Sequence, residues 1–211
     1  MLNTVSSSEA EAVDRRPIAY TIGHSNHPSE FLRSLLKQFQ IDLLVDLRSH
    51  PYSKYAVQYN RETLQQALRG EGIDYRGEGQ TLGGLPQDEE FYDAEGYVLY
   101  GEIAKSPAFR AGILRLLRLI QEYHCVLMCS EENPAACHRH LLISRVLSDE
   151  GIRVLHIRGT GEIEEEDQLR AEERRQQMTG QATLFDLEEE APWRSIQSVS
   201  PIKARRNSLG S

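Results

Sequence analysis

The stretch Val126–Arg139, V-L-M-C-S-E-E-N-P-A-A-C-H-R, decides which fold this chain adopts. Its apolar first half predicts a buried strand that ends at Cys129, and Pro134 is a favoured first residue of a following helix. In open α/β sheets, ligands bind where the carboxyl ends of strands lead into helix N-termini. The stretch therefore predicts a site at this turn, with five residues capable of chemistry: Cys129, Glu131, Cys137, His138 and Arg139.

The rest of the chain repeats this alternation of strand and helix. Apolar strands are predicted at residues 18–22, 41–47, 73–75, 125–129 and 153–157. Apolar stripes at helical spacing predict helices from Pro28, over residues 60–69, from Ser106 and over residues 134–149. Strands that are apolar on both faces and alternate with helices are typical of an α/β fold. We therefore expect a mostly parallel sheet with helices on both faces.

Length and composition divide the chain into three parts. A length of 211 residues accommodates one domain of about 150 residues with extensions. Residues 1–16 are polar and are predicted to be a disordered extension, and residues 17–160 are predicted to form the α/β domain. Residues 161–211 are predicted to be a polar, partly disordered C-terminal tail, with an acidic helix at 161–178 followed by flexible chain.

Composition and charge exclude several classes of protein. No segment reaches the roughly 18 apolar residues of a membrane span, and three irregularly spaced cysteines form no disulfide framework, so we expect a cytoplasmic protein with free thiols. The net charge of −8 is concentrated in residues 160–190, which leaves the domain without the broad basic surface of nonspecific DNA-binding proteins. Local basic patches stay open around Arg48, Lys54, Arg61 and Arg76.

A parallel sheet would bring residues from four strand ends to one edge. These residues are His24, Asp46 with Arg48, Cys129 with Glu131, and His156. Each also has a purely structural interpretation. A histidine can hydrogen-bond a neighbouring loop or cap a strand, and Asp46 with Arg48 can form an ion pair that holds a loop. Taken together, the residues favour a functional site at this edge.

The helix predicted after Pro134 orients two further side chains. Its inward stripe contains Leu142 and Ile143, and one turn earlier the same face carries His138 and Arg139. We therefore expect both side chains on the sheet-facing side, at the mouth of the cleft. The positive end of the helix and a bidentate arginine favour a phosphate or carboxylate there.

Three interpretations of the cysteines stay open. Cys129 or Cys137 can be a nucleophile whose pKa is lowered by the helix end and by neighbouring histidine and arginine. Alternatively, Cys129 and Cys137 can bind a metal ion with His138 or His24, although the C-x7-C-H spacing matches no standard zinc motif. Cys129, like Cys125 inside its strand, can also be a small buried hydrophobic residue. No cofactor is predicted apart from such a metal ion.

Four ordered motifs resemble the family called domain of unknown function 488 (DUF 488). They are Thr21–Asn26 (T-I-G-H-S-N), Val45–Pro51 (V-D-L-R-S-H-P), Leu82–Pro86 (L-G-G-L-P) and Met128–Arg139 (M-C-S-E-E-N-P-A-A-C-H-R). The resemblance covers roughly residues 18–160, implies a compact α/β fold and indicates a site without naming a reaction. The site positions that match the family pattern are His24, Ser25, Asp46, Arg48, Cys129, Glu131, Cys137, His138 and Arg139.

A fainter similarity is to rhodanese-like domains, which pair a D-x-R strand end with a catalytic cysteine in a loop before a helix. Asp46-Leu-Arg48 and Cys129 match those parts. The loop from Cys129 to Arg139 is longer than the short anion-binding loop of rhodaneses. The similarity is therefore an analogy of architecture and does not carry sulfur transfer to this chain.

The tail contains a short apolar motif in polar surroundings. Gln181–Phe185, Q-A-T-L-F, is similar to the Q-x-x-L-F peptides with which bacterial replication and repair proteins dock on the DNA sliding clamp. Such a segment would present Leu184 and Phe185 to an apolar pocket, with Gln181 hydrogen-bonding beside it. The alternative is that the two apolar residues pack back on their own domain.

Three hypotheses of function follow. The first is an enzyme that acts on a small phosphate-bearing or nucleic-acid substrate in the strand-end cleft. Its predicted residues are, for substrate binding, Ser25, Arg48, His138 and Arg139 and, for catalysis, Cys129, His24, Asp46 and Glu131. The second is a non-catalytic module that the tail motif recruits to DNA repair or replication machinery. The third is a metal-binding protein that uses Cys129, Cys137 and His138.

Overall fold

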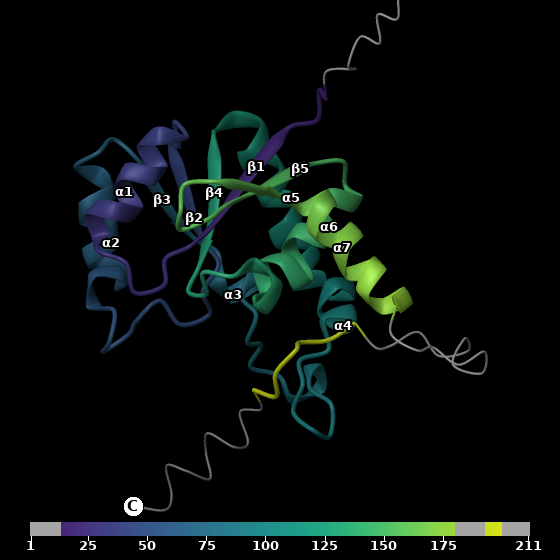
Figure 1. The fold of residues 1–211 in the computed structure, drawn as a ribbon. Coiled ribbons are helices and arrows are strands. Elements are labelled where there is room, and N and C mark those ends of the chain that lie inside the picture. Colours follow the sequence, from purple (N-terminus) through teal and green to yellow (C-terminus); the bar gives the residue numbers. More distant parts are fainter. Residues whose placement is uncertain (1–13, 180–192, 200–211) are drawn as a thin grey trace, which may run out of the picture.

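The computed structural model describes residues 14–179 and 193–199, which contain a six-stranded sheet (Figure 1). The strand order is β3-β2-β4-β1-β5-β6. The strands are β1 (Ile18–Gly23), β2 (Leu43–Asp46), β3 (Asp74–Gly77), β4 (Cys125–Cys129), β5 (Arg153–Ile157) and β6 (Ile163–Glu165). All neighbouring strands are parallel except β5 and β6, which are antiparallel. The predicted mostly parallel sheet is confirmed.

Helices cover both faces of this sheet, as predicted (Figure 1). They are α1 (Ser29–Gln38), α2 (Arg61–Arg69), α3 (Gly79–Leu82), α4 (Tyr100–Lys105), α5 (Pro107–Glu122), α6 (Arg145–Asp149) and α7 (Glu166–Thr179). The first two pack on one face, α3 to α6 pack on the other, and α7 lies beside α6 and β5. Among the described residues, no helix combines the length and the apolar character needed to cross a membrane.

The core consists of two layers because alternate residues of a strand point to opposite faces. In β4, Val126 and Met128 pack under α1 and α2, whereas Cys125 and Leu127 pack under α5. Every residue of β4 is buried, as expected for a parallel strand covered on both sides. The continuous apolar run in the sequence thus fixes β4 at the centre of the sheet and places Cys129 at its carboxyl end.

The helix predicted over residues 134–149 is interrupted. The segment contains a 3-10 turn at Pro134–Ala136, a π-helical turn at Arg139–Ser144 and then α6. Asn133 caps the first turn, because its side chain accepts a hydrogen bond from the backbone N–H of Ala135 at 3.1 Å. The prediction of a helix start at Pro134 is therefore correct only for one short turn, and the regular helix begins eleven residues later.

Both ends of the predicted domain extend further than the sequence pattern indicated. Arg16 forms ion pairs of 2.8 Å with Asp14 and with Asp167 of α7, so the end of the N-terminal extension contacts the domain. After β5, a tight turn leads into β6, and only then does the acidic helix α7 begin. A three-residue strand is too short to give a periodic signal, which is why β6 was not predicted. Residues 1–13 lie outside the described residues.

Residues 193–199 do not behave as the flexible terminus predicted for that region. The ring N–H of Trp193 donates to the carbonyl oxygen of Leu141. The backbone N–H of Ser195 donates to the carbonyl oxygen of Val98 at 2.9 Å. Trp193 also packs against the core beneath α5. This segment, which we call the C-terminal wall, is therefore part of the folded domain.

Candidate active site

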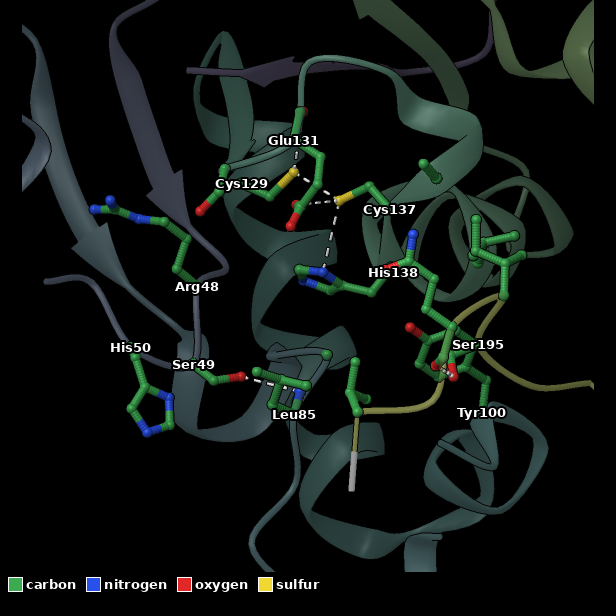
Figure 2. A pocket seen from close by; sticks show the side chains of 17 residues that line it. Arg48, Ser49, His50, Leu85, Tyr100, Cys129, Glu131, Cys137, His138 and Ser195 are labelled. Atoms are coloured by element: carbon green, nitrogen blue, oxygen red, sulfur yellow. Dashed lines mark hydrogen bonds between the residues drawn. The ribbon is translucent and has the colours of Figure 1, made fainter. Parts of the chain in front are cut away.

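The site lies where the central strands end. Cys129, the last residue of β4, is in register with Gly23 of β1, and Asp46 of β2 is in register with Met128. A pocket of about 240 Å³ opens at this edge (Figure 2). Five predicted site residues line it: Arg48, Cys129, Glu131, Cys137 and His138. The predicted convergence of distant segments at one edge of the sheet is thus observed for these five.

Two cysteine sulfurs face each other at one side of this pocket (Figure 2). The Sγ atoms of Cys129 and Cys137 are 2.7 Å apart. The Cys137 thiol also donates to Oε2 of Glu131 at 3.2 Å and lies 3.7 Å from Nδ1 of His138. The side chains form a continuous chain from Cys129 through Cys137 to the Glu131 carboxylate, which we call the thiol relay.

Burial and hydrogen bonding set the protonation of the relay. Cys129 and Cys137 are 0 % and 2 % exposed, and burial raises the pKa of Cys137 well above its ordinary value, so that this group stays a thiol at neutral pH. Glu131 is exposed as a residue, but its carboxylate turns inward. Desolvation there acts to raise the pKa of Glu131, whereas the hydrogen bond from Cys137 lowers it, and the net shift is downward. Glu131 is therefore ionised at neutral pH, and its carboxylate accepts the hydrogen bond from Cys137.

Arg139 lies behind the thiols rather than at the mouth of the cleft. It is 0 % exposed, and its Nη1 is 3.6 Å from Sγ of Cys129. Its Nη2 donates to the carbonyl oxygen of Glu132. The expectation that Arg139 faces the cleft mouth is wrong, because the interrupted helix turns its side chain into the protein. From this position its charge acts on the Cys129 sulfur and not on a ligand in the pocket.

Asp46 and Arg48 form a buried, bidentate ion pair. Nε and Nη2 of Arg48 donate to the two carboxylate oxygens of Asp46 at 2.9 and 2.6 Å, and Nη2 also donates to the carbonyl oxygen of Tyr59. The Arg48 guanidinium points away from the thiols (Figure 2). Of the two interpretations from the sequence, the structure shows the ion pair that holds a loop. Asp46 does not line the pocket.

His24 and Ser25 lie beside the site without lining the pocket. The His24 ring stacks on Tyr59 at 4.2 Å between ring centroids, and its Nε2 lies 3.2 Å from Nη1 of Arg48. Burial lowers the pKa of His24 to about 4, so the ring is neutral at pH 7. The backbone N–H of Ser25 donates to the carbonyl oxygen of Ser130 at 2.8 Å. Both residues join the strand end of β1 to the loop that carries the thiol relay.

His138 is held in the pocket by the glycine-rich loop. Burial lowers the pKa of His138 to about 4, so its ring is also neutral at pH 7. A Cβ atom at Gly84 would lie 2.5 Å from Cγ of His138, so that only glycine lets the loop approach the ring. The Leu82–Pro86 loop therefore closes one side of the site.

Other residues that line the pocket were not predicted from the sequence. The C-terminal wall contributes Ser195, Ile196, Gln197 and Val199, and Ser49, His50 and Tyr100 line other sides. Trp193, the only tryptophan of the chain, was an available signal, because an isolated large aromatic residue in a polar tail is often an anchor. Ser49 and His50 directly follow the D-L-R strand end.

His156 belongs to a different cluster. The Nε2 atom of His156 contacts Oε2 of Glu166 at 2.9 Å. The Nδ1 atom of His140 contacts the same oxygen at 2.7 Å. The side chain of Thr21 contacts the other ring nitrogen of His156 at 2.6 Å. All these side chains are buried between β5, the π-helical turn and α7. The prediction that His156 joins the strand-end site is wrong, because its side chain points into the core beneath α7.

Two groups of side chains in the described part of the chain have the composition of a metal site. One is Cys129, Glu131 and Cys137, whose ligand atoms lie within 4.8 Å of one another. The other is the buried cluster of His140, His156 and Glu166. Only the first borders the pocket, and His138 stands beside it as a fourth potential ligand.

Comparison with known proteins adds the family and no activity. The model of the family described as domain of unknown function DUF488 matches residues 27–146, more than half of the chain. The chain belongs to the DUF488 family. No curated protein and no solved structure matches it. The DUF488 match contains Asp46, Arg48 and the thiol relay, whereas His24 and Ser25 precede it. The tail motif Gln181–Phe185 lies outside both the match and the described residues.

Proposed function

We propose that this protein is an enzyme that uses Cys129 as a nucleophile. The observation that carries the proposal is the thiol relay with the charge of Arg139 behind it. The two sulfurs are 2.7 Å apart, the Glu131 carboxylate is 3.2 Å from Cys137, and Nη1 of Arg139 is 3.6 Å from Cys129. A nucleophile beside a proton acceptor and a compensating charge is the usual arrangement of cysteine catalysis.

The relay gives each group one role. In one concerted step the Cys129 proton moves to Cys137 while the Cys137 proton moves to the Glu131 carboxylate, so that Cys137 is a thiol before and after and the negative charge forms on Cys129 beside Arg139. The Cys129 sulfur then bonds to an electrophilic atom of the substrate, and the leaving group departs from that atom with its electron pair. An incoming nucleophile then displaces Cys129 from the same atom as a thiolate and loses its own proton to solvent, and the proton held by Glu131 returns through Cys137 to restore the Cys129 thiol. His138 and His24, both neutral at pH 7, shape the site and add no charge.

A metal centre is the second candidate, because the same atoms are suitable ligands. Thiolates and imidazole are preferred by zinc, and Cys129, Cys137, Glu131 and His138 provide one donor atom each. Arg139 argues against this candidate. A buried guanidinium 3.6 Å from a ligand sulfur repels a dication, whereas it stabilises a free thiolate.

Alkylation kinetics test the first proposal with an internal control. The protein is treated with iodoacetamide at pH 7, and each cysteine is followed by peptide mass spectrometry. We expect Cys129 to react at least about tenfold faster than Cys125, whose pKa burial raises to about 12. Changing Glu131→Gln, which keeps the size but removes the proton acceptor, is expected to slow Cys129 by about a hundredfold or more. A Cys129 that reacts no faster than Cys125 would refute the nucleophile.

Elemental analysis tests the metal candidate. Protein purified without chelators is compared with Cys129→Ser and Cys137→Ser variants. Stoichiometric zinc in the wild type that is lost from both variants would establish the metal centre and replace the first proposal. The Cys125→Ser variant is the control, because Cys125 lies inside β4 and away from the pocket lining. We expect no stoichiometric metal in any of the four proteins.

A further inference from the structure

A second depression continues from the thiol pocket along the protein surface. It is a groove of about 710 Å³ that shares Arg48, Ser49 and His50 with the pocket. Its other walls come from the loop after β2, the start of α2 and the end of β3. At about 240 Å³ the pocket is smaller than the roughly 300–1,000 Å³ of ordinary ligand sites. The pocket alone is therefore smaller than an ordinary ligand site, and the groove continues from it.

The groove carries two arginines that are available to a ligand. Arg61 is the first residue of α2, and Arg76 is exposed on β3. Neither forms an ion pair with any residue that the structure describes, and the Arg61 side chain hydrogen-bonds that of Tyr75. The Nε atom of Arg61 is buried without a hydrogen-bond partner. Arginines held in this way suit the oxygens of phosphate groups.

Three acidic residues near these arginines are already engaged. Asp46 is paired with Arg48, and Glu78 is paired with Arg115 at 2.7 Å. The third, Glu62, accepts a hydrogen bond of 2.7 Å from the hydroxyl of Tyr52. Arg61 and Arg76 therefore add positive charge to the groove, even though the whole chain has a net charge of −8.

One exposed tyrosine lines the groove with these arginines, and a second follows it on the same loop. Tyr52 lines the groove and is 55 % exposed, and Tyr55, three residues further along the same loop, is 79 % exposed. The ammonium group of Lys54 lies 5.1 Å from the centre of the Tyr55 ring. Exposed tyrosines between basic residues are the pattern with which proteins stack the bases and contact the phosphates of single strands.

We propose that this groove binds single-stranded nucleic acid, with phosphates on Arg61 and Arg76 and bases stacked on Tyr52 and Tyr55. An acidic peptide would account for the arginines but would leave the two exposed rings unexplained. A flexible strand can turn from the groove into the pocket beside His50, whereas a stacked duplex cannot place one nucleotide there. That the strand is also the substrate rests on the proposed function of Cys129, whereas the binding itself does not.

Fluorescence anisotropy with a labelled oligothymidylate of about 12 nucleotides tests the proposal. Changing Arg61→Gln and Arg76→Gln together is expected to weaken binding at least about tenfold and to reduce the salt slope by about 0.7 for each lost contact. The matched control changes Arg110→Gln and Arg118→Gln, two exposed arginines of α5 on the opposite face, and is expected to leave affinity unchanged.

Further variants separate charge, stacking and chemistry. Changing Tyr52→Ala and Tyr55→Ala is expected to weaken binding by about tenfold or more without changing the salt slope. Arg61→Lys with Arg76→Lys is expected to restore part of the affinity, which shows that the loss is not misfolding. Cys129→Ser is expected to bind like the wild type, so that a failed alkylation test and a failed binding test are distinguishable.

Three results would overturn the inference. They are the absence of oligonucleotide binding at low salt, an equal loss of affinity in the α5 control, and equal affinity for a duplex of the same length. Retention of an acidic peptide in place of the oligonucleotide would likewise reject the nucleic acid as ligand.

Discussion

Gly23 determines how closely the backbone approaches the thiols. A Cβ atom at this position would lie 1.7 Å from the carbonyl oxygen of Glu131 and 2.6 Å from Nη1 of Arg139. No side chain larger than a hydrogen fits there. Gly23 therefore allows the end of β1 to meet the loop after β4, and it leaves room for Arg139 to reach Cys129.

Changing Gly23→Ala is expected to push this loop away from β1. We expect a loss of about 1–3 kcal/mol in the free energy of unfolding, as for other overpacked sites, together with slower alkylation of Cys129. Urea denaturation and the alkylation assay measure the two effects. Gly70→Ala is the control, because a Cβ atom there makes only ordinary contacts from 3.5 Å. A Gly23→Ala protein as stable and reactive as the wild type would contradict the close approach.

The sequence predicted which residues meet at the site better than it predicted the direction of each side chain. Cys129, Glu131, Cys137 and His138 were predicted from their position after a buried strand, and the structure brings them together. The direction of Arg139 was predicted from a regular helical period, which fails where the helix contains a π-helical turn. All of Arg139–Ser144 is buried, so the turn has no exposed polar face. The sequence therefore shows no change of period at this turn.

At the scale of elements, the buried cluster around Glu166 fastens α7 to the domain. His140 of the π-helical turn and His156 of β5 both contact Oε2 of Glu166. His140 also contacts Glu173, one of whose oxygens accepts from Arg145 at 2.8 Å. This role could not be predicted from the sequence, because Glu166 stands in a run of acidic residues and nothing in the run marks it as the buried one.

Changing Glu166→Gln is expected to destabilise the protein by about 3–5 kcal/mol, because it removes one member of a buried charged cluster. Urea denaturation measures the change, and hydrogen exchange is expected to show the largest loss of protection in α7. The exposed Glu172→Gln variant on the same helix is the control and is expected to stay within about 0.5 kcal/mol of the wild type.

The stability difference between wild type and Glu166→Gln is also expected to depend on pH. Burial acts to lower the pKa of His140, but its contacts with Glu166 and Glu173 raise it above 6.5 overall. The stability that protonated His140 contributes is therefore complete below pH 6.5 and is lost as the pH rises through the raised pKa. Burial acts to raise the pKa of Glu166, but the histidines lower it below 4.5 overall. The stability that ionised Glu166 contributes is therefore complete above pH 4.5 and is lost as the pH falls through the lowered pKa.

The effect should therefore be largest between pH 4.5 and 6.5 and should shrink towards alkaline pH. Burial lowers the pKa of His156, so protonation of His156 below pH 6.5 destabilises both proteins. The stability difference between the two proteins is therefore the quantity to compare. A difference that grows with pH would contradict the assignment of His140 as the charged partner.

At the scale of the whole molecule, the tail contains two features that can be tested separately, the motif Gln181–Phe185 and the C-terminal wall. The sliding-clamp hypothesis concerns Gln181–Phe185, and it predicts that purified bacterial clamp retains the wild-type protein in a pull-down. Changing Leu184→Ala and Phe185→Ala is expected to abolish retention, whereas Leu187→Ala, outside the Q-x-x-L-F pattern, is expected to preserve it. Equal retention of all three proteins would reject the hypothesis and with it the link to replication or repair.

The general fold followed from the sequence because a parallel sheet leaves continuous apolar runs, as in β4. The C-terminal wall did not, because its seven residues are bound by backbone hydrogen bonds and one anchor rather than by a periodic pattern. Its packing on the domain depends on Val98, Gly101 and Leu141, which are distant in the sequence. Such contacts become visible only once the fold is known.

Truncation tests whether the C-terminal wall completes the site. A chain that ends after Pro192 lacks Trp193 and the four wall residues that line the pocket. We expect its Cys129 to react several-fold faster with a bulky maleimide, because one side of the pocket is open, and we expect weaker discrimination between bulky and small reagents. A chain that ends after Val199 keeps the wall and is expected to react like the full-length protein. If both truncated chains behave alike, the wall does not control access to Cys129, and the pocket is defined by the loops after β2 and β4 alone.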